Sequence, residues 1–212
     1  MKKYLIAILF GLFTISQASA ELGVNVGISG SAGLFAASGK EVAGKTTKGT
    51  EHGAAGWTSI FIEKSFGDRF AIGIDYLPSA LETDTVETAK TDLDDGTTAV
   101  RTNQIQIDFE DLTTLYIAVN VTENAYLKLG VMKVDVVTNE KLGTGATYGN
   151  TDLDGTSIGF GTSKNFDNGL FVRAEANYMT FDSTSGLVSG DNTITLTNLD
   201  GVTGSLKIGK SF

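Results

Sequence analysis

The chain has no cysteine and only one proline, Pro78, among its 212 residues. Without cysteine there are no disulfides and no thiol chemistry, so stability must come from a packed core or from a closed network of backbone hydrogen bonds. Proline removes a hydrogen-bond donor from a strand ladder, so its scarcity favours long, uninterrupted ladders. The two shortages together favour a protein built on extended sheets.

Long apolar runs and basic residues are also scarce. After Ala20, no apolar stretch approaches the roughly 20 residues that a membrane-spanning helix requires. Lysine and arginine number 16 against 25 aspartates and glutamates, which gives a net charge of −9. Nucleic-acid binding requires basic patches, so we expect no nucleic-acid partner.

The first twenty residues have the pattern of a secretory signal. Lys2 and Lys3 precede an apolar run from Leu5 to Ile15, and Ala18-Ser19-Ala20 forms a small-residue cleavage site. A membrane anchor is the alternative, but the run is shorter than a transmembrane helix. We predict a cleaved signal peptide over residues 1–20 and one domain over residues 21–212. Loss of Lys2 and Lys3 would leave a mature chain with a net charge of −11.

Hydrophobic residues in the rest of the chain alternate with a period of two, as in strands. In the first predicted strand, residues 22–37, one face carries Val26, Ile28 and Leu34, and the other is small and polar. A soluble sandwich would direct large apolar residues into its core and leave the polar face in water. A membrane barrel reverses this arrangement, with apolar residues outside and polar residues inside.

The same alternation marks seven further strands. They are predicted at residues 56–66, 70–77, 105–121, 126–138, 156–166, 170–182 and 204–212. The turns after the second, fourth and sixth strands are short, whereas residues 38–55, 79–103, 139–155 and 183–200 are predicted to be long loops. This asymmetry predicts an all-β fold, an eight-stranded antiparallel up-and-down transmembrane β-barrel with short periplasmic turns and long outer loops.

Two strands leave their register open. In the fourth, Ile105, Ile107 and Phe109 have the same odd numbering as Leu115 and Ile117, which indicates one face of a strand that continues above the membrane. In the fifth, Leu127, Leu129 and Val131 compete with Met132, Val134 and Val136 for the outer face. A bulge near Gly130 would reconcile the two sets.

The tripeptide Lys-x-Phe closes three of the descending strands. Its members are Lys64 with Phe66, Lys164 with Phe166, and Lys210 with Phe212. We predict that the three phenylalanines form an aromatic girdle at the periplasmic interface, and that the lysines extend their ammonium groups back to lipid phosphate. We expect Tyr126 and Lys128 to mirror this arrangement on the fifth strand.

If apolar residues face lipid, five charged residues must point into the barrel. They are Glu63, Asp75, Arg173, Glu175 and Lys207. Eight strands leave an interior that side chains about fill, so we predict a structural network of buried ion pairs. The alternative is a gated ion pathway through the same residues.

The chain resembles the small eight-stranded outer-membrane β-barrel family, to which the OmpA transmembrane domain and OmpX belong. The resemblance rests on the terminal segment Leu206-x-Ile208-x-Lys210-x-Phe212 and on the penultimate strand, residues 169–178, with charged residues facing inward. It implies that the barrel-assembly machinery reads Phe212 as an assembly signal. Lys210 departs from the family pattern, which usually places an aromatic or apolar residue there.

No other motif indicates chemistry. Asp92-x-Asp94-Asp95-Gly96 and Asp152-x-Asp154-Gly155 lack the spacing of a calcium loop and are predicted to be solvated surface charge. His52, the single histidine, has no recognisable nucleophile beside it. We therefore expect no catalytic residues, no metal site and no cofactor.

These observations predict a non-enzymatic integral outer-membrane protein of a Gram-negative bacterium. We expect a monomer whose partners are outer-membrane lipid and the barrel-assembly machinery, with an envelope-structural or surface-contact role carried by its outer loops. A porin-like passive channel for ions or small molecules is the main alternative. A soluble periplasmic β-sandwich is a third.

Overall fold

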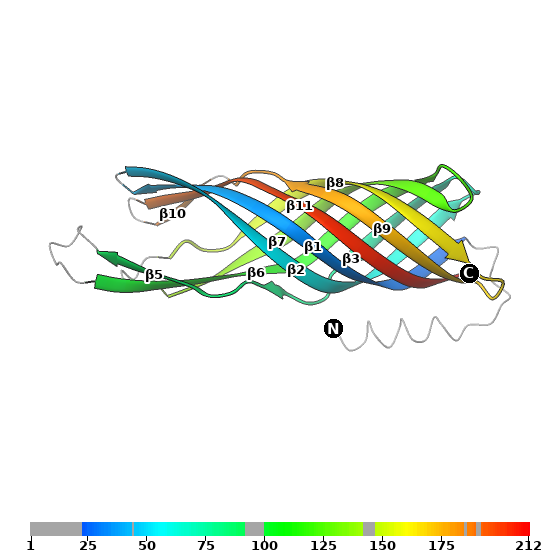
Figure 1. Ribbon diagram of the computed structural model, residues 1–212, viewed down its shortest axis with the longest axis horizontal. Coiled ribbons are helices and arrows are strands. Elements are labelled where there is room, and N and C mark those ends of the chain that lie inside the picture. Colours follow the sequence, from blue (N-terminus) through cyan, green and yellow to red (C-terminus); the bar gives the residue numbers. More distant parts are fainter. Residues whose placement is uncertain (1–22, 44, 92–99, 142–146, 185, 190–191) are drawn as a thin grey trace.

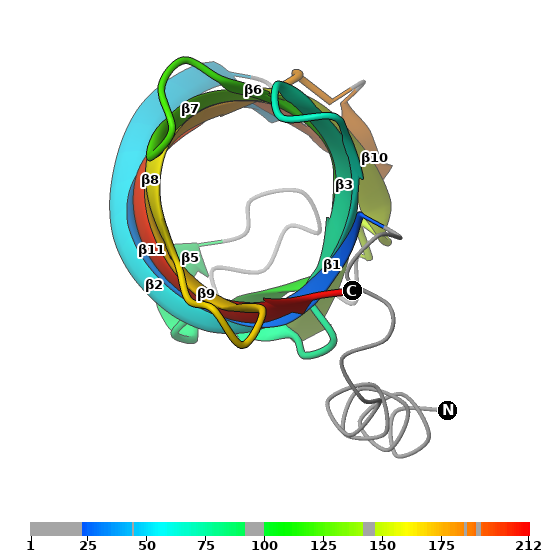
Figure 2. The ribbon, with the colours of Figure 1, turned by 90° about the vertical axis from the view of Figure 1, so that its right-hand side faces the viewer.

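The protein is a closed antiparallel β-barrel (Figures 1 and 2). The computed structural model describes residues 23–43, 45–91, 100–141, 147–184, 186–189 and 192–212, so the predicted signal peptide lies outside the described residues. Eight strands form the ring, in the order β1-β2-β3-β6-β7-β8-β9-β11, and β11 pairs with β1 to close it. The predicted all-β, eight-stranded up-and-down fold is confirmed.

The ring strands differ greatly in length. They are β1 (Val24–Ala43), β2 (Lys45–Phe66), β3 (Phe70–Tyr76), β6 (Val100–Asn120), β7 (Ala125–Lys141), β8 (Thr151–Asn165), β9 (Leu170–Phe181) and β11 (Asn192–Ser211). Three short strands extend the sheet beyond the ring: β4 (Leu81–Glu82) and β5 (Val86–Thr91) pair with β6, and β10 (Leu187–Ser189) pairs with β11. Within the described residues there is no helix long and apolar enough to cross a membrane.

Much of the sequence predicted as outer loop is strand. β1 and β2 form one continuous hairpin whose pairing runs from Val24↔Lys64 to Ala43↔Lys45, so the predicted loop at residues 38–55 is wrong. β8 likewise begins at Thr151 and β11 at Asn192, inside predicted loops. Pairing satisfies the backbone groups of these glycine- and threonine-rich segments without requiring an apolar side chain at every second position.

β3 is short, and the barrel wall changes where it ends. β3 pairs with β2 from Phe66↔Phe70 up to Ile60↔Tyr76. Pro78 follows, and proline cannot donate to a ladder. The chain beyond it pairs with β6 through β4 and β5, so above Ile60 the described strand pairing of β2 is with β1 alone. The outer end of the barrel therefore divides into two prongs, one around β1 and β2 and one around β5 and β6 (Figure 1).

A bulge in β6 reverses which side chains face inward. Between Glu110 and Thr113 the pairing with β7 gains one residue, and Asp111 has a φ of 54°. Tyr116 and Leu112 face inward below the bulge, whereas Phe109 packs against the inner apolar cluster above it. The prediction that Ile105, Ile107 and Phe109 share a face with Leu115 and Ile117 is wrong, because an extra residue exchanges the two faces of a strand.

β7 has no bulge at Gly130, so that prediction is also wrong. Its pairing with β8 is regular from Ala125↔Thr162 to Val136↔Thr151. The competing apolar sets belong to different levels of one regular strand. Leu127, Leu129 and Val131 are exposed on the outer face, and Met132, Val134 and Val136 are buried inside. Above Val131 the outer positions become Lys133 and Asp135, so the strand changes from a membrane pattern to a soluble one.

The barrel consequently has two levels with opposite polarity. Around the periplasmic half, apolar side chains face outward and charged side chains are buried inside. In the outer half, an apolar cluster fills the interior; its buried members are Leu77, Leu112, Met132, Val134, Val136, Leu153, Met179, Phe181 and Leu199. The outer half is therefore stabilised like a water-soluble barrel, by burial of its own core.

Candidate functional site: a closed polar interior

The charged interior is assembled from five strands. β2 supplies Glu63, β3 supplies Asp75, β7 supplies Lys128, β9 supplies Arg173 and Glu175, and β11 supplies Lys207. Each lies at an inward position because its chain neighbours are apolar and face outward, as Ile62, Ile74, Leu127, Val172 and Ile208 do. Strand alternation alone thus brings six charges into one lumen.

Glu63 and Arg173 form a two-pronged ion pair. Arg173 Nη1 and Nη2 donate to Glu63 Oε2 and Oε1, both at 2.9 Å. Asn25 Nδ2 donates to Oε1 at 2.8 Å, and the Tyr116 hydroxyl donates to Oε2 at 3.1 Å. Four donors match the acceptor capacity of a carboxylate, so the charge of Glu63, only 2% exposed, is fully compensated.

The other four charges form a chain across the lumen. Lys207 Nζ lies 2.8 Å from Asp75 Oδ2 and 3.3 Å from Glu175 Oε2. Lys128 Nζ lies 3.1 Å from the same Glu175 oxygen, and the Tyr126 hydroxyl donates to Glu175 Oε1 at 2.6 Å. Glu175, on β9, therefore joins cations from β7 and β11, two strands that are not neighbours in the ring.

Aromatic rings surround the cations. Lys128 Nζ lies 4.2 Å from the ring centre of Tyr116, and Lys207 Nζ lies 5.0 Å from that of Phe61. The Arg173 guanidinium lies 4.5 Å from the ring centre of Phe171. Ring faces attract cations, and these contacts are strongest where water is excluded. The aromatic rings occupy the space between the ion pairs, through which an aqueous path would have to pass.

The charges of this interior balance. Three carboxylates, Glu63, Asp75 and Glu175, are paired with three cations, Lys128, Arg173 and Lys207. A buried network of zero net charge attracts neither cations nor anions from solution. Removal of any one member would leave an uncompensated buried charge, which is strongly unfavourable.

A layer of hydroxyl groups separates the ion pairs from the apolar cluster. It encloses a cavity of about 40 Å³ lined by Ser31, Ser59, Thr114, Ser157 and Thr203, among others. This volume has room for only a few water molecules. The lumen is thus filled twice, by ion pairs toward the periplasm and by apolar side chains toward the outside.

The structure brings the five predicted interior residues together and adds one that the sequence analysis missed. Lys128 is 6% exposed and Tyr126 is 3% exposed, and both point inward. The expectation that they mirror the interfacial lysine and aromatic pairs is therefore wrong. The outward alternation of Leu127, Leu129 and Val131 was the available signal, since it fixes the opposite face for Tyr126 and Lys128.

The predicted girdle residues lie at the ends of their strands. Phe66 and Phe166 are 53% and 49% exposed, whereas Phe212 is 7% exposed. Lys64 Nζ lies 5.9 Å from the ring centre of Phe66, and Lys210 Nζ lies 5.4 Å from that of Phe212. The backbone of Phe212 exchanges two hydrogen bonds with Val24. Lys164 is exposed.

The remaining candidate residues show no assembled chemistry. His52 is exposed on the outer face of β2. Asp152 and Asp154 lie on β8 rather than in a loop, and Asp152 Oδ2 lies 2.8 Å from Lys133 Nζ. Asp92, Asp94, Asp95 and Gly96 lie outside the described residues. In the part of the chain that the structure describes, no group of three or more metal-ligating side chains could hold an ion.

A closed antiparallel ring with an outer apolar band, a polar interior and short turns at one end defines an integral outer-membrane β-barrel. Comparison of the sequence with protein families agrees with this class. Residues 5–204 match the family model described as the outer membrane protein beta-barrel domain, and the chain belongs to this family. No curated protein sequence matches it significantly.

Several solved outer-membrane proteins match the structure. The outer membrane protein OprG from Pseudomonas aeruginosa is 12% identical, with a TM-score of 0.51 over 90% of this chain and 96% of that one. Ail, the attachment invasion locus protein of Yersinia pestis, is 12% identical, with a TM-score of 0.38 over 88% of this chain and 99% of that one. The outer membrane protease OmpT from Escherichia coli is 9% identical, with a TM-score of 0.44 over 89% and 96%.

Proposed function

We propose that this protein is a non-enzymatic barrel that holds a rigid structure at the cell surface and acts in envelope structure or surface contact. The observation that carries this proposal is the double closure of the lumen. A neutral ion-pair network fills one level, and the apolar cluster around Leu77 and Leu112 fills the other. Neither level offers a charged, hydrated path, so a passive channel is not favoured.

The outer prongs are the parts that would make such contacts. β1 and β2 pair without interruption to Ala43↔Lys45, and β6 pairs with β5 to Val100↔Thr91. Continuous ladders keep these segments rigid and present the same residues constantly. The residues at the tips lie where surface proteins carry their contact function.

Export and assembly complete the proposal. The signal peptide over residues 1–20 is removed on export, the barrel-assembly machinery inserts the chain, and the barrel works as a monomer in outer-membrane lipid. N-terminal sequencing of the membrane-extracted protein should give Glu21 as the first residue. A chain that begins at Met1 would contradict cleavage.

Conductance of the purified mature chain in planar bilayers tests the closed lumen. We expect no discrete conductance steps from wild type. The matched variants are Arg173→Gln, inside the barrel, and Lys164→Gln, on its exposed face. Reproducible wild-type steps that change with Arg173→Gln, but not with Lys164→Gln, would establish a channel and overturn the proposal.

A further inference from the structure

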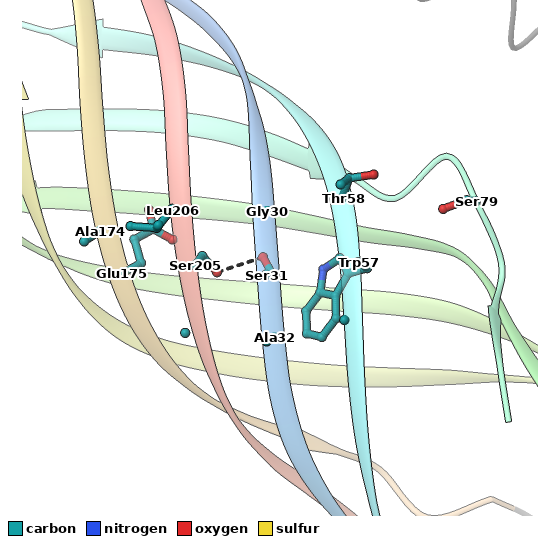
Figure 3. Close-up of a pocket in the computed structure, with 12 residues that line it drawn as sticks. Gly30, Ser31, Ala32, Trp57, Thr58, Ser79, Ala174, Glu175, Ser205 and Leu206 are labelled. Carbon is teal, nitrogen blue, oxygen red and sulfur yellow. Dashed lines mark hydrogen bonds between the residues drawn. The ribbon is translucent and has the colours of Figure 1, made fainter. Parts of the chain in front are cut away.

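One wall of the barrel is hollowed where β9, β11, β1 and β2 carry small outward residues (Figure 3). Ala174, Gly204, Gly30, Ala32 and Gly56 line a hollow of about 860 Å³, and the inward-facing Ser31, Trp57, Glu175 and Ser205 also border it. A Cβ atom added to Gly30 or Gly204 would meet no atom within 4 Å. On the other strands the outward positions carry large side chains; examples are Ile72, Ile74, Leu115, Ile117, Leu129 and Ile158.

Two further hollows continue the first toward the outer surface. The next, of about 490 Å³, shares Ala32 and Gly56 with the first and is also lined by Leu34 and Ala54. The third, of about 450 Å³, shares Leu34 and Ala54 with the second and reaches His52. Together they form a groove along β1 and β2 that points toward the tip of the hairpin. Its lining residues are mostly apolar and small, with the polar His52, Tyr178 and Asp200 at the end nearest the tip.

Two lysines stand above this groove without an acidic partner. Lys40 and Lys48 lie directly opposite each other in the β1–β2 hairpin. Regular alternation places both on the outward face, with Ser38 and Thr50, whose hydroxyl groups are 2.9 Å apart. The described structure gives neither lysine an ion pair. The acids of this hairpin, Glu41 and Glu51, occupy odd-numbered positions, which lie on the inward face. Like charges directly opposite are unfavourable unless an anion compensates them.

The position of Lys48 matches the outer phosphate level of a bilayer. Lys48 and Lys64 share the outward face of β2 and are sixteen residues apart. This spacing is about 53 Å along a strand and about 37 Å along the membrane normal at a tilt of about 45°. The outward apolar band of an outer-membrane barrel is about 25 Å tall. With Lys64 at its periplasmic edge, Lys48 stands about 12 Å above its outer edge, within reach of the outer phosphates, and the lowest hollow, around Gly30 and Gly204, lies in the hydrocarbon below.

We propose that this wall is a binding site for a phosphorylated lipid, with an acyl chain in the groove and the phosphate between Lys40 and Lys48. The apolar groove lies below the two unpaired lysines, just as the acyl chains of such a lipid lie below its phosphate. The groove lets a chain approach the backbone closely, which increases dispersion contact. The acyl chain would lie on the outward face of the wall, whereas the ion pairs lie on its inward face, so the proposal holds whether or not the lumen conducts.

Trp57 provides the probe. It is the only tryptophan in the chain and borders the lowest hollow from the inward face of β2, with its ring centre 6.1 Å from that of Phe35 (Figure 3). The mature protein, refolded in detergent micelles, is titrated with phosphatidic acid brominated on its acyl chains, and in parallel with equally brominated phosphatidylcholine. We expect saturable quenching of Trp57 at about 25-fold lower phosphatidic acid, since each of the two lysines contributes about a fivefold preference for an anionic lipid.

Matched variants divide the site into its two parts. Lys40→Gln with Lys48→Gln should raise the half-saturating phosphatidic acid about 25-fold, whereas Lys141→Gln with Lys164→Gln, the same charge change elsewhere, should not. Gly30→Leu fills the groove and should abolish saturable quenching. Its control is Gly49→Leu, at a position where an added Cβ also meets nothing within 4 Å. Heat-modifiable gel mobility confirms that each variant is folded.

Four results would overturn the site. Equal quenching by the two lipids would leave only general contact with acyl chains. Unchanged binding by the double lysine variant would remove the phosphate contact, and unchanged binding by Gly30→Leu would remove the groove. Quenching replaced by concentration-dependent dimerisation, measured by light scattering, would instead assign the wall to a second copy of the chain.

Discussion

Arg173 and Glu63 are 110 residues apart in the sequence, yet two parallel hydrogen bonds of 2.9 Å join them inside the barrel. They lie on β9 and β2, which are not neighbours in the ring. The pair therefore connects strands that share no ladder. It forms only when the ring is closed, so its interaction energy contributes to the free energy of ring closure.

Arg173→Ala should destabilise the barrel by about 3–5 kcal/mol, because Glu63 would remain charged and buried without its main partner. Guanidinium unfolding in detergent micelles, followed by gel mobility, measures the change. Arg173→Met combined with Glu63→Gln should recover a large part of the loss. If the double variant is no more stable than Arg173→Ala, the uncompensated charge is not the cause. Arg69→Ala, at an exposed turn, is the control.

Lys128→Met should cost about as much as loss of any member of a buried ion pair, about 3–5 kcal/mol. Lys128 Nζ lies 3.1 Å from Glu175, and its replacement would leave Lys207 as that carboxylate's only cation. Lys164→Met, on the exposed face of β8, should change the free energy of unfolding by less than about 0.5 kcal/mol. Equal effects of the two substitutions would place Lys128 outside the network.

The β6 bulge holds the backbone of Asp111 in the left-handed conformation, with a φ of 54°. Asp111→Gly should be tolerated, whereas Asp111→Val should cost about 1–2 kcal/mol, since a β-branched residue with positive φ is strained. The Tyr76 hydroxyl also donates to Asp111. Tyr76→Phe removes that bond alone, and its unfolding free energy separates the two contributions. A valine variant as stable as the glycine variant would contradict the strain.

Interior and lipid-facing glycines should respond differently to the same substitution. A Cβ added at Gly161 would lie 2.3 Å from a ring carbon of Tyr126, whereas one at Gly204 meets nothing within 4 Å. Gly161→Ala should therefore displace Tyr126 from Glu175 and cost about 1–3 kcal/mol, with little change for Gly204→Ala. The two unfolding curves, measured side by side, provide the comparison; indistinguishable curves would contradict the tight interior packing.

Phe212→Ala should impair assembly more than Phe166→Ala. Phe212 is buried and its backbone pairs with Val24 at the closing seam, whereas Phe166 is half exposed beside a turn. Folded protein in isolated outer membranes, normalised to total chain, measures assembly. Equal loss in both variants would mean that the terminal residue anchors the barrel without acting as an assembly signal.

Most of the architecture could be predicted from the sequence, because a membrane barrel repeats a simple pattern. Outward residues such as Ile74, Leu115 and Ile208 had to be apolar at every second position, which identified the strands and their count. The outer half was harder to predict, because β1 and β2 continue there with polar and glycine residues on both faces. Backbone hydrogen bonds between neighbouring strands hold those segments together, and such bonds leave little signal in the hydrophobic pattern of the sequence.

By itself, the sequence determined which residues alternate along each strand, where the tight turns fall and that charges such as Arg173 and Glu175 share a face. Only the tertiary structure decided which charges meet, such as Lys128 with Glu175, and that Asp111 reverses the face of β6. The physical reason is that alternation is a property of one strand and fixes faces only relative to each other. Contacts across the lumen depend on the stagger between all eight strands, which is set when β11 closes on β1.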